Sequence, residues 1–395
     1  MSSRILIIPG GPFQLDLIDA AKRRGLSTVV ADGNPLAPGL RLADFPEPVN
    51  PTGIAALVEV ARRHRVCGVV SMASDPCVIP CAAVAEALGL PGLSRGVAER
   101  ARNKHQSLER IREIAPEYCP RFAMLPSLEE AATVLDAIGF PLVLKPQASN
   151  GSKGVVIVET AADFPAAFRY ATRFSGGLPL IAEERLTGHE VSVETWSVAG
   201  EVHVIAVVDK MTTTPPYCVE VGHTTPSRLP RAHVEQLAEA ARAIVRALGI
   251  ENGPAHNELF MTPNGPRFVE TGARLGGGCI ASHLVPLSTG VDLVEASLDL
   301  ALGRPVNIGP SHTRAAAIRF LRPAPGVVSR VRGLAGARTM TGIAGVACGI
   351  ETGDEVLPLE NSDQRMGHVI AGGNDPDEAA RFADAALARI EIVTN

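Results

Sequence analysis

The sequence predicts a chain of several α/β and α+β domains, and three observations lead to this prediction. In the first hundred residues, short apolar runs alternate with helical patterns in a βαβαβ order, which favours a parallel, doubly wound sheet. From about Pro120, helical patterns stand beside long alternating strands, as in an α+β region. The residues after 310 form a smaller β-rich piece that ends in a helix. A length of 395 residues allows two or three domains, each able to bury its own core.

The N-terminal pattern can be divided into individual elements. A helix is expected to begin after Thr52, as its N-cap, with Ile54, Leu57, Val58 and Ala61 on its apolar face. The predicted strands are 4–9, 28–32 and 66–71, and the other predicted helices are 13–24 and 78–88.

The loop after the first strand bears on cofactor use. It reads Gly-Gly-Pro-Phe-Gln, whereas a dinucleotide-binding domain has the pattern GxGxxG at this point. Pro12 stands where an amide would face phosphate, and proline has no N–H to donate. The sequence therefore disfavours a dinucleotide cofactor here and favours a structural or substrate-supporting role.

The later regions carry clear start and stop signals. Ser127 and Glu130 form a predicted capping box for a helix that ends at Ile138. Asp375, followed by Pro376 and Glu378, predicts the start of the last helix. The other expected elements are strands at 140–145, 155–158, 180–184, 190–198 and 201–208, and a strong amphipathic helix at 232–248.

Composition excludes several classes of protein. The chain is 46% hydrophobic with a net charge of −5, which excludes disorder. Charges of both signs are mixed without a basic run, so we expect no nucleic-acid partner, and no window predicts a membrane span. The seven cysteines are scattered without a metal-binding spacing, which suggests reduced thiols and a cytoplasmic location.

Two glutamates flank a predicted hairpin turn at 263–265. Glu258 and Glu270 are equally distant from Asn264, so a symmetric hairpin would place their carboxylates opposite each other. Like charges in this position are destabilising, so either one is protonated or a cation lies between them. A hard divalent ion, Mg²⁺ or Mn²⁺, fits best, with phosphate oxygens completing its shell. The alternative is a solvated hairpin with two unrelated glutamates.

An arginine and three glycines follow this hairpin. Arg274 lies four residues beyond Glu270, and its planar fork suits a phosphoryl or carboxylate group. Gly276 to Gly278 can present free backbone amides to an anion. The alternative is a flexible surface loop with a salt-bridged arginine.

Two further segments are candidates for nucleotide binding. Residues 145–154 join two predicted strands and concentrate glycine, serine and lysine, as a phosphate-binding loop requires, although any polar hairpin loop looks similar. Residues 181–191 run from strand to loop to strand, where backbone groups could read an adenine edge and Glu190 could accept ribose hydroxyls. Read alone, Glu183, Glu184 and Glu190 are typical of surface acids.

These four segments, in this order, resemble the ATP-grasp superfamily, and more closely its carboxylate–amine ligase branch, which includes bacterial L-amino acid ligases that make dipeptides. The resemblance covers nearly the whole chain and implies three parts: a pre-ATP-grasp domain at 1–105, an ATP-grasp domain at 106–310 and a C-terminal domain at 311–395. It divides the ATP-grasp domain into a small lobe at about 115–180 and a large lobe at about 181–310. The C-terminal match rests mainly on Gly-His-Val-Ile-Ala-Gly-Gly at 367–373.

The resemblance also implies ATP and Mg²⁺ (or Mn²⁺) as cofactors and assigns residues to them. Two lysines would contact the phosphates, a serine- and glycine-containing loop would close over them, and acidic residues would frame adenine and ribose. The residues assigned to ATP are Lys104, Lys145, Ser149, Gly151, Ser152, Gly154, Glu183, Glu184, Leu186 and Glu190. The metal residues are Glu258 and Glu270, and the implied catalytic residues are Arg274, Lys145 and His223. The implied substrate-binding residues are Arg274, Gly276, Gly277, Gly278 and His223, although a lone histidine is more often a core or surface residue.

One position departs from the wider superfamily. Many ATP-grasp enzymes have asparagine two residues after the second metal glutamate, and this chain has Gly272 there. The amino acid ligase branch often lacks that asparagine and has the later arginine, as here. The substitution favours that branch and leaves the coordination of a second metal open.

The resemblance implies an ADP-forming ligase that joins a small carboxylate, such as an amino acid, to an amine through an acyl phosphate. One alternative is an ATP-grasp enzyme that activates bicarbonate or formate in a purine or carbamoyl-type pathway. Another is a nucleotide-binding homologue that has lost catalysis. A homodimer is expected from the family.

Overall fold

A parallel four-stranded sheet, in the order β3-β2-β1-β4, forms the centre of the N-terminal domain in the computed structural model, which describes residues 3–395. Its strands are β1 (Arg4–Ile7), β2 (Ser27–Ala31), β3 (Phe45–Glu47) and β4 (Gly68–Val70). Its helices are α1 (Leu15–Arg23), α2 (Pro38–Leu42), α3 (Ile54–His64) and α4 (Val78–Leu88). The predicted parallel α/β arrangement of this domain is therefore confirmed.

Two helix starts differ from the sequence prediction. The chain forms a short 3₁₀ turn at Pro12–Gln14 before α1, so the α-helix begins two residues later than expected. Thr52 does not cap α3, because its hydroxyl donates to the side chain of Asn50 and Gly53 takes the N-cap position. A local turn at Asn50 thus competes with the helix for the threonine side chain.

Two helices lead from this domain into a small lobe. They are α5 (Arg95–Arg102) and α6 (Lys104–Ile114), so the domain boundary expected after residue 105 falls inside α6. The small lobe has an antiparallel sheet in the order β5-β8-β6-β7. Its elements are β5 (Phe122–Leu125), α7 (Ala131–Ile138), β6 (Leu142–Pro146), β7 (Val156–Val158), α8 (Phe164–Thr172) and β8 (Leu180–Glu184).

Two expectations about the small lobe are wrong. The lobe boundary at about 181 would divide β8, which pairs with β5 and β6 and belongs to the small sheet. The capping box at Ser127 does not form, because Glu130 is the N-cap of α7 and makes no side-chain capping bond.

An eight-stranded antiparallel sheet forms the large lobe and continues into the C-terminal region, in the order β13-β12-β9-β10-β11-β14-β18-β16. Helix α9 packs against the large-lobe strands, and its apolar face lies in their core. The large-lobe elements are β9 (His189–Val198), β10 (Glu201–Thr212), β11 (Glu220–Thr225), α9 (Arg231–Leu248), β12 (Gly253–Thr262), β13 (Gly265–Gly272), α10 (Val285–Thr289) and α11 (Leu293–Ala301).

The C-terminal region is joined to the large lobe by hydrogen bonds between β11 and β14. Its elements are β14 (Ala315–Phe320), β15 (Gly326–Arg332), α12 (Leu334–Arg338), β16 (Ile343–Cys348), β17 (Glu355–Val356), β18 (Gly367–Gly373), α13 (Pro376–Arg389) and β19 (Glu391–Thr394). Helix α13 begins as predicted, with the Asp375 carboxylate accepting from the Glu378 amide. The Glu378 carboxylate accepts from the amide of Asn374, one residue before the cap.

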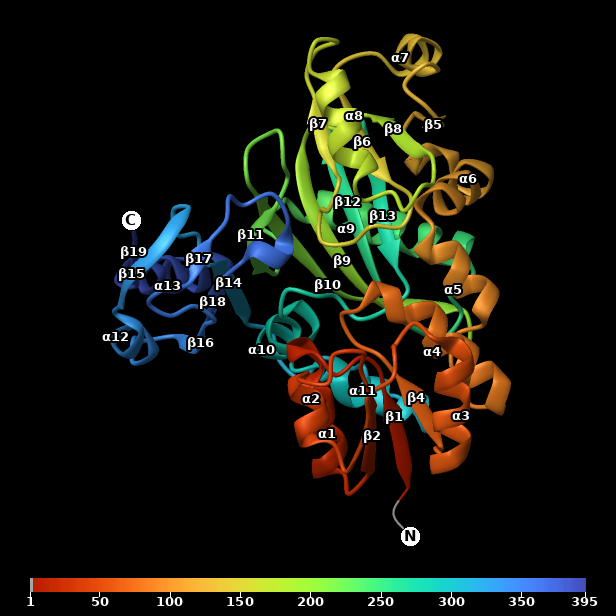
Figure 1. The fold of residues 1–395 in the computed structure, drawn as a ribbon, viewed down its shortest axis with the longest axis vertical. Coiled ribbons are helices and arrows are strands. Elements are labelled where there is room, and N and C mark those ends of the chain that lie inside the picture. The colour runs from red at the N-terminus through yellow and green to blue at the C-terminus, as the bar shows by residue number, and fades with distance from the viewer. Residues whose placement is uncertain (1–2) are drawn as a thin grey trace.

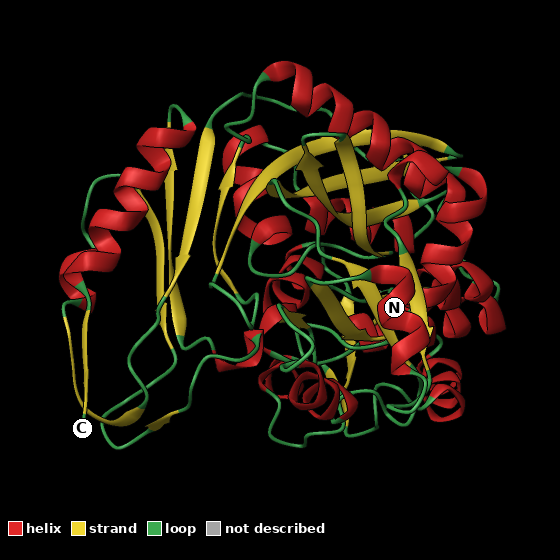
Figure 2. Cartoon of the chain, turned by 90° about the horizontal axis from the view of Figure 1, so that it is seen from above, coloured by secondary structure: helices red, strands yellow, loops and turns green. Residues whose placement is uncertain are grey.

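The parts pack around a shared core. One apolar cluster combines Ile5 and Leu17 of the N-terminal domain with Leu284 and Leu298 of the large lobe and Phe320 of β14. Figure 1 shows the N-terminal domain below the large sheet, the small lobe above it and the C-terminal region to one side. Seen from above, the C-terminal strands and α13 stand beside the central strands (Figure 2).

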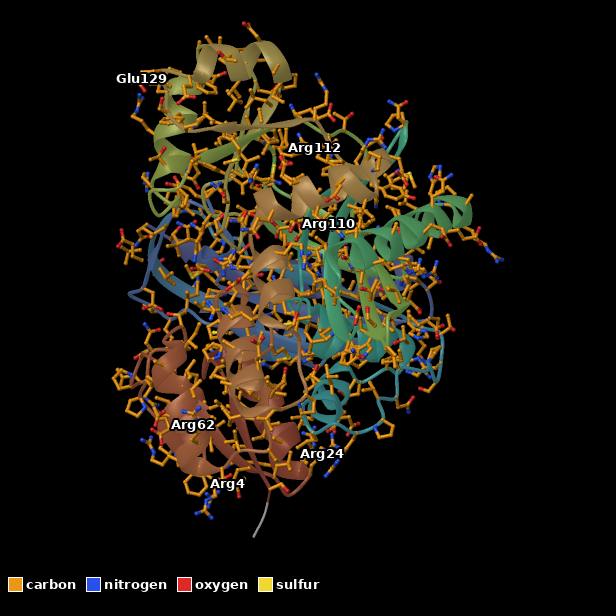
Figure 3. The ribbon with its side chains drawn as sticks, turned by 90° about the vertical axis from the view of Figure 1, so that its right-hand side faces the viewer. Arg4, Arg24, Arg62, Arg110, Arg112 and Glu129 are labelled. Atoms are coloured by element: carbon orange, nitrogen blue, oxygen red, sulfur yellow. The ribbon has the colours of Figure 1, made fainter. Side chains whose placement is uncertain are left out.

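The arginines labelled in Figure 3 are spread over the N-terminal domain and α6. Several of them pair with acidic neighbours, as in Arg62 with Glu59 and Arg110 with Glu113. Among the described residues, no helix is long and apolar enough to cross a membrane.

Candidate active site

A cavity of about 250 Å³ lies where the N-terminal domain, both lobes and the C-terminal region meet. Phe13 and Asp75 line it from the N-terminal domain, and Ser362 and Arg365 line it from the C-terminal region. The predicted site residues that line it are Lys104, Lys145, Ser149, Gly151, Ser152, Glu183, Glu184, Leu186, Glu190, Glu258, Glu270, Arg274, Gly277 and Gly278. The structure thus brings together most of the residues that the sequence singled out.

Glu258 on β12 and Glu270 on β13 are direct partners across the hairpin, as predicted. The reason differs from the expectation, because the turn pairs Thr262 with Gly265 and is not centred on Asn264. A register shift between Glu258 and Leu259 moves the pairing by one residue, so that Glu258 lies opposite Glu270.

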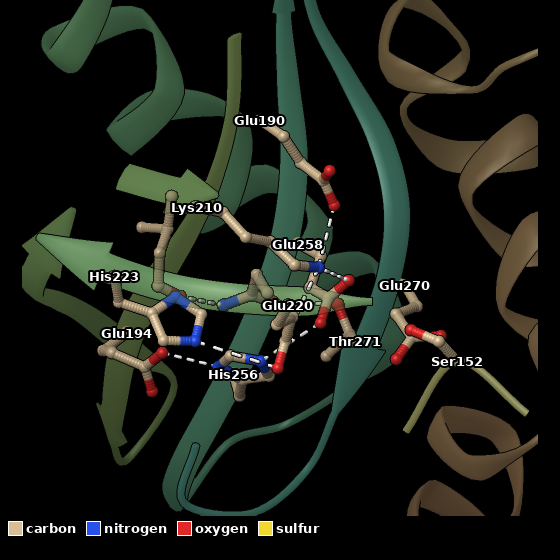
Figure 4. Close-up of polar contacts among 12 residues, drawn as sticks. Ser152, Glu190, Glu194, Lys210, Glu220, His223, His256, Glu258, Glu270 and Thr271 are labelled. Atoms are coloured by element: carbon tan, nitrogen blue, oxygen red, sulfur yellow. Dashed lines mark hydrogen bonds and ion pairs between the residues drawn. The ribbon is translucent and has the colours of Figure 1, made fainter. Parts of the chain in front are cut away.

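Lys210 on β10 lies at the centre of a buried charge cluster, the Lys210 cluster, with Glu190, Glu220 and Glu258 (Figure 4). Its ammonium is 2.7 Å from Glu258 and 2.8 Å from Glu190. Glu220 lies further away, at 3.4 Å. Burial alone would lower the pKa of Lys210, but these carboxylates hold that pKa well above its usual value.

A histidine supports Glu258 from the other side. Nδ1 of His256 lies 2.5 Å from Glu194, and its Nε2 lies 3.4 Å from Glu258. Burial would lower the pKa of His256, but the two glutamates raise it to about 10. Burial would raise the pKa of Glu258, but Lys210 and His256 hold it at about 2. Glu258 is therefore an ionised carboxylate at neutral pH.

The two lysines expected at the ATP phosphates are both buried and both beside carboxylates. Lys104 lies 3.0 Å from Glu270 and donates to the carbonyl of Ser149 at 2.8 Å. Lys145 lies 2.7 Å from Glu183. Glu183 is only 5% exposed, so it is not the solvated surface acid that the sequence alone suggested.

The remaining residues assigned to the nucleotide lie around the edges of the cavity. Glu184 accepts hydrogen bonds from the backbone and guanidinium of Arg121. Leu186 lines the cavity, as does Glu190, which contacts Lys210 in this structure.

The predicted phosphate loop lies between β6 and β7 and touches the C-terminal region. The amide of Ser362 donates to the carbonyl of Gly151 at 3.0 Å, and Lys153 lies 2.5 Å from Asp363. Gly154 does not line the cavity, because it packs against Pro146 and Phe174.

Arg274 is fixed by the N-terminal domain. Its Nη2 lies 2.6 Å from the carboxylate of Asp75, which begins a short 3₁₀ helix after β4. A Cβ built on Gly272 would lie 3.2 Å from the Arg274 guanidinium carbon, which is tighter than nearly all real Cβ contacts. A side chain at 272 would therefore require the Arg274 side chain to shift.

The glycine run and His223 are arranged differently from the expectation. Gly277 and Gly278 line the cavity, but a Cβ on Gly276 would meet Glu194 and His256, so Gly276 supports that pair instead. His223 is fully buried on β11, and neither ring nitrogen makes a hydrogen bond within the described residues. Its Nε2 lies 3.8 Å from Glu220 and 3.3 Å from the Cβ position of Gly278.

The donor set suits a hard divalent cation. Glu258 and Glu270 offer carboxylate oxygens from adjacent strands, and each already accepts a lysine ammonium, at 2.7 and 3.0 Å. Among residues 3–395, no group of three or more His, Cys, Asp or Glu side chains is arranged to hold a metal. Two protein carboxylates with phosphate oxygens completing the shell is the arrangement that the sequence predicted.

Sequence reasoning did not assign four charged residues that complete the site: Asp75, Lys210, Glu220 and Arg365. Lys210 lies beyond the predicted end of its strand at 208, and β10 in fact continues to Thr212. Asp75 lies four residues beyond the end of the third predicted strand at 71, and a polar residue near that edge of a parallel sheet was a usable signal. Glu220 and Arg365 lie in segments without clear periodicity.

Comparison with known proteins identifies an ATP-grasp domain within this chain. A family model described as an ATP-grasp domain matches residues 138–282. Residues 319–395 match a second model, described as L-amino acid ligase C-terminal domain 2. A solved L-amino acid ligase from Bacillus licheniformis has the same fold, with a TM-score of 0.86 and 23% identity, and the match covers 100% of this chain and 99% of that one.

Three curated proteins are similar to this chain in sequence and differ in how much of their length the match covers. Carnosine synthase 1 from Gallus gallus is 31% identical over 249 residues, 58% of this chain but only 27% of that protein. Alanine–anticapsin ligase from Bacillus subtilis (strain 168) is 28% identical over 247 residues, 56% of this chain and 51% of that protein. A formate-dependent phosphoribosylglycinamide formyltransferase from Synechococcus sp. (strain CC9605) is 26% identical over 416 residues, 98% of this chain and 97% of that protein. The chain thus spans about half or less of the two ligases.

Proposed function

We propose that the protein is an ATP-dependent carboxylate–amine ligase that forms an amide or peptide bond through an acyl phosphate and releases ADP and phosphate. The observation that carries this proposal is the facing pair Glu258 and Glu270 in a cavity that also contains Lys104, Lys145 and Arg274. Amino acids or similar small acids are the proposed substrates, because the names of the related ligases specify amino acids.

The reaction has two steps. A substrate carboxylate oxygen attacks the γ-phosphorus of ATP, a new P–O bond forms, and the bond to the β-phosphate oxygen breaks to release ADP. The amine nitrogen then attacks the acyl carbon, the C–N bond forms, and the C–O bond breaks as phosphate leaves with the amine proton. Activation is required because a carboxylate is a poor electrophile with a poor leaving group.

The residues around the cavity have separate tasks in these steps. Lys104 and Lys145 bind the phosphates, and the loop containing Ser149, Gly151 and Ser152 covers them. Arg274, oriented by Asp75, stabilises the transferring phosphoryl group and the acyl phosphate. His223 borders the substrate pocket through Gly278. Gly277 and Gly278 give the substrate close access to backbone.

The adenosine end of the nucleotide is proposed to lie towards β8 and the loop after it. Glu183, Glu184 and Leu186 would frame the adenine, and Glu190 would accept the ribose hydroxyls after turning from Lys210. Glu258 and Glu270 would bind Mg²⁺ or Mn²⁺, which offsets negative charge on the phosphates when bound.

The test is a screen of purified protein for phosphate release with ATP, Mg²⁺, carboxylic acids and amines, with mass spectrometry of the products. We expect ADP and a condensed product whose mass equals acid plus amine minus water. ATP binding without ADP release across a broad amino acid panel would contradict the proposal and favour a homologue without catalysis.

A second candidate is activation of formate or bicarbonate. It is favoured by the nearly full-length match to the formate-dependent phosphoribosylglycinamide formyltransferase. Formate or bicarbonate in the same screen separates the two, because ADP release with these acids alone, and with no amino acid, would support the second candidate.

The cellular location, the oligomeric state and the partners are also proposals. We propose a cytoplasmic homodimer that acts on small molecules and binds neither nucleic acid nor membranes. Size-exclusion chromatography with light scattering tests the oligomeric state, and a monomer at all concentrations would exclude the dimer.

A further inference from the structure

Residues 360–363 of the C-terminal region form a clasp on the loop between β6 and β7. The Ser362 amide donates to the Gly151 carbonyl at 3.0 Å, and the Lys153 ammonium lies 2.5 Å from the Asp363 carboxylate. Ser362, Asp363 and Gly151 all line the cavity of the candidate active site. The contact between the clasp and the loop is therefore part of the cavity wall.

The clasp approaches the loop closely because residue 151 is glycine. Gly151 has φ of +60°, and an added Cβ would lie 3.3 Å from the Cβ of Ser362. The Ser362 hydroxyl has no hydrogen-bond partner among the described residues, so this residue contacts the loop through its backbone amide. On α8, which follows β7, the Tyr170 hydroxyl donates to the carbonyl of Glu360 at 3.4 Å. The small lobe thus contacts the clasp at both of its ends.

The clasp has a fixed shape and is anchored to the large lobe. A capping box formed by Asn361 and Gln364 closes its 3₁₀ turn. Arg365, the next residue, donates from Nε to the carbonyl of Ser362, and its Nη1 lies 3.2 Å from Glu220 on β11. The loop between β6 and β7 is therefore held by a rigid support.

From these contacts we propose that the clasp keeps the loop between β6 and β7 closed over a bound nucleotide. Ser362 and Asp363 are positioning residues, and they act through Gly151 and Lys153. The nucleotide can leave only when the loop separates from the clasp, which breaks the backbone hydrogen bond and the ion pair together. The clasp therefore slows the release of nucleotide.

The same closure protects the acyl phosphate from water, and this second consequence rests on the proposed ligase function. In the unwanted reaction, a water oxygen attacks the acyl carbon, a new C–O bond forms, and the bond to the phosphate oxygen breaks. The acid is regenerated and phosphate leaves with a proton of the water, so one ATP is consumed without an amide. A closed loop that excludes water keeps phosphate release matched to amide formation.

The first test measures nucleotide release. A fluorescent ATP analogue bound to the full chain is displaced by excess ATP in a stopped-flow instrument, once with Mg²⁺ and once with EDTA. Asp363→Asn removes the charge that pairs with Lys153. Ser362→Pro removes the donating amide, and proline suits the first residue of the 3₁₀ turn Ser362–Gln364. Ser362→Ala keeps the amide and is the comparison for Ser362→Pro.

A matched control weakens another ion pair of the C-terminal region. Asp377, at the start of α13, lies 2.8 Å from Arg228 of the large lobe. Its side chain is 87% exposed and that of Asp363 is 69% exposed. Neither Asp377 nor Arg228 lines the cavity. Asp377→Asn should therefore release the analogue at the wild-type rate.

In Asp363→Asn we expect the analogue to leave about two- to fivefold faster than from the wild type, as for a partly exposed ion pair. The effect is partial because the Ser152 hydroxyl still donates to the carbonyl of Cys218 at 3.1 Å. Release from Ser362→Pro should be about fivefold or more faster than from Ser362→Ala, because a backbone hydrogen bond is lost and the proline ring meets the Gly151 carbonyl.

Two further variants show whether Asp363 acts through Lys153. Asp363→Glu keeps the charge and should restore most of the slow release. In a Lys153→Gln background, Asp363→Asn should have no further effect, because the partner of the carboxylate is already absent.

The second test measures the amounts of phosphate and amide with the acid and amine that give most product in the ligase screen. In the wild type and in Asp377→Asn, the phosphate released should equal the amide formed. In Asp363→Asn and Ser362→Pro the phosphate should exceed the amide, most of all at low amine concentration, where the acyl phosphate persists longest before the amine attacks.

Equal release rates in the wild type, Asp363→Asn and Ser362→Pro would overturn the proposal. An equal acceleration in Asp377→Asn would also overturn it, because it would show a general loosening of the C-terminal region. Faster release with phosphate still equal to amide would overturn the protection from water. A wild type that binds the analogue but forms no amide would contradict the proposed ligase function instead, and the release rates would still decide whether the clasp closes the loop.

Discussion

At the scale of single residues, Arg274 is the most decisive test of the proposed chemistry. Its side chain is 12% exposed and ion-paired with Asp75, and it lines the same cavity as Glu258 and Glu270, so it is fixed before substrate arrives. In Arg274→Ala we expect kcat to fall by about 10²- to 10³-fold, as for other preorganised groups that stabilise a transition state, with ATP affinity changed far less. Steady-state kinetics and equilibrium binding of an ATP analogue measure the two effects. Near-normal turnover would contradict its assigned role.

His368 on β18 gives a prediction about pH. Burial, with help from His283 and Arg365, lowers its pKa to about 4, whereas the unfolded chain titrates near 6.5. Between these values the unfolded state binds more protons, so this residue destabilises the fold as pH falls from 6.5 to 4. In His368→Gln this acid-dependent loss of folding stability disappears.

Relative to wild type, the variant His368→Gln should therefore gain stability on acidification, by at most about 3 kcal/mol at pH 4. Urea unfolding across this pH range measures the difference. A flat profile for His368→Gln would show that this histidine is not kept neutral by burial.

Residue identities alone allowed the facing pair Glu258 and Glu270 to be predicted, but for an incomplete reason. The spacing assumed a hairpin centred on Asn264, and the observed turn would by itself have paired Glu258 with Val269; a bulge corrected the register. Bulges depend on tertiary packing and leave no reliable mark in one sequence. Lys210 was missed because a lysine beside a predicted strand end suggests solvent, whereas three distant carboxylates make its burial possible.

At the scale of elements, the loop between β6 and β7 depends on a glycine that does not touch the cavity. Gly154 has φ of +73°, and an added Cβ would lie 2.7 Å from Pro146 and 3.0 Å from Phe174. Gly176 has φ of +61° with nothing within 4 Å of its Cβ position. An alanine at either position would be strained by the positive φ, but only an alanine at 154 would also clash with its neighbours.

Gly154→Ala should therefore lower the free energy of unfolding by at least about 1 kcal/mol more than Gly176→Ala. It should also weaken binding of an ATP analogue, because displacement of the loop moves Gly151 and Ser152. Denaturant unfolding and calorimetric titration measure the two effects. Equal losses in the two variants would show that the loop tolerates the clash by shifting elsewhere.

The sequence predicted most elements well where their periodicity is local, as in the parallel N-terminal strands and α9. It failed at junctions. The lobe boundary at about 181 divided β8, because pairing with β5 is a long-range contact that no local pattern records. Likewise, no local pattern could show that β14, β18 and β16 extend the large-lobe sheet, a continuity that lets the C-terminal region supply Arg365.

At the scale of the whole molecule, ligand binding should stabilise all parts of the chain together, because each part contributes to the cavity wall and much of the core is shared. A ligand at about 100 times its Kd adds about 2.7 kcal/mol to the free energy of unfolding. A non-hydrolysable ATP analogue should therefore raise the melting temperature, and Mg²⁺ should add a further increment if it binds between Glu258 and Glu270.

Glu270→Gln separates the metal from the nucleotide. It removes one carboxylate from the pair and leaves Lys145 and the loop between β6 and β7 in place, so the metal-free stabilisation by the analogue should persist while the increment from Mg²⁺ disappears. Glu201→Gln, at an exposed position of β10, is the matched control and should retain both effects. Differential scanning fluorimetry with and without EDTA measures them. An undiminished Mg²⁺ increment in both Glu258→Gln and Glu270→Gln would show that the metal binds to phosphate alone, and the facing carboxylates would then need another role.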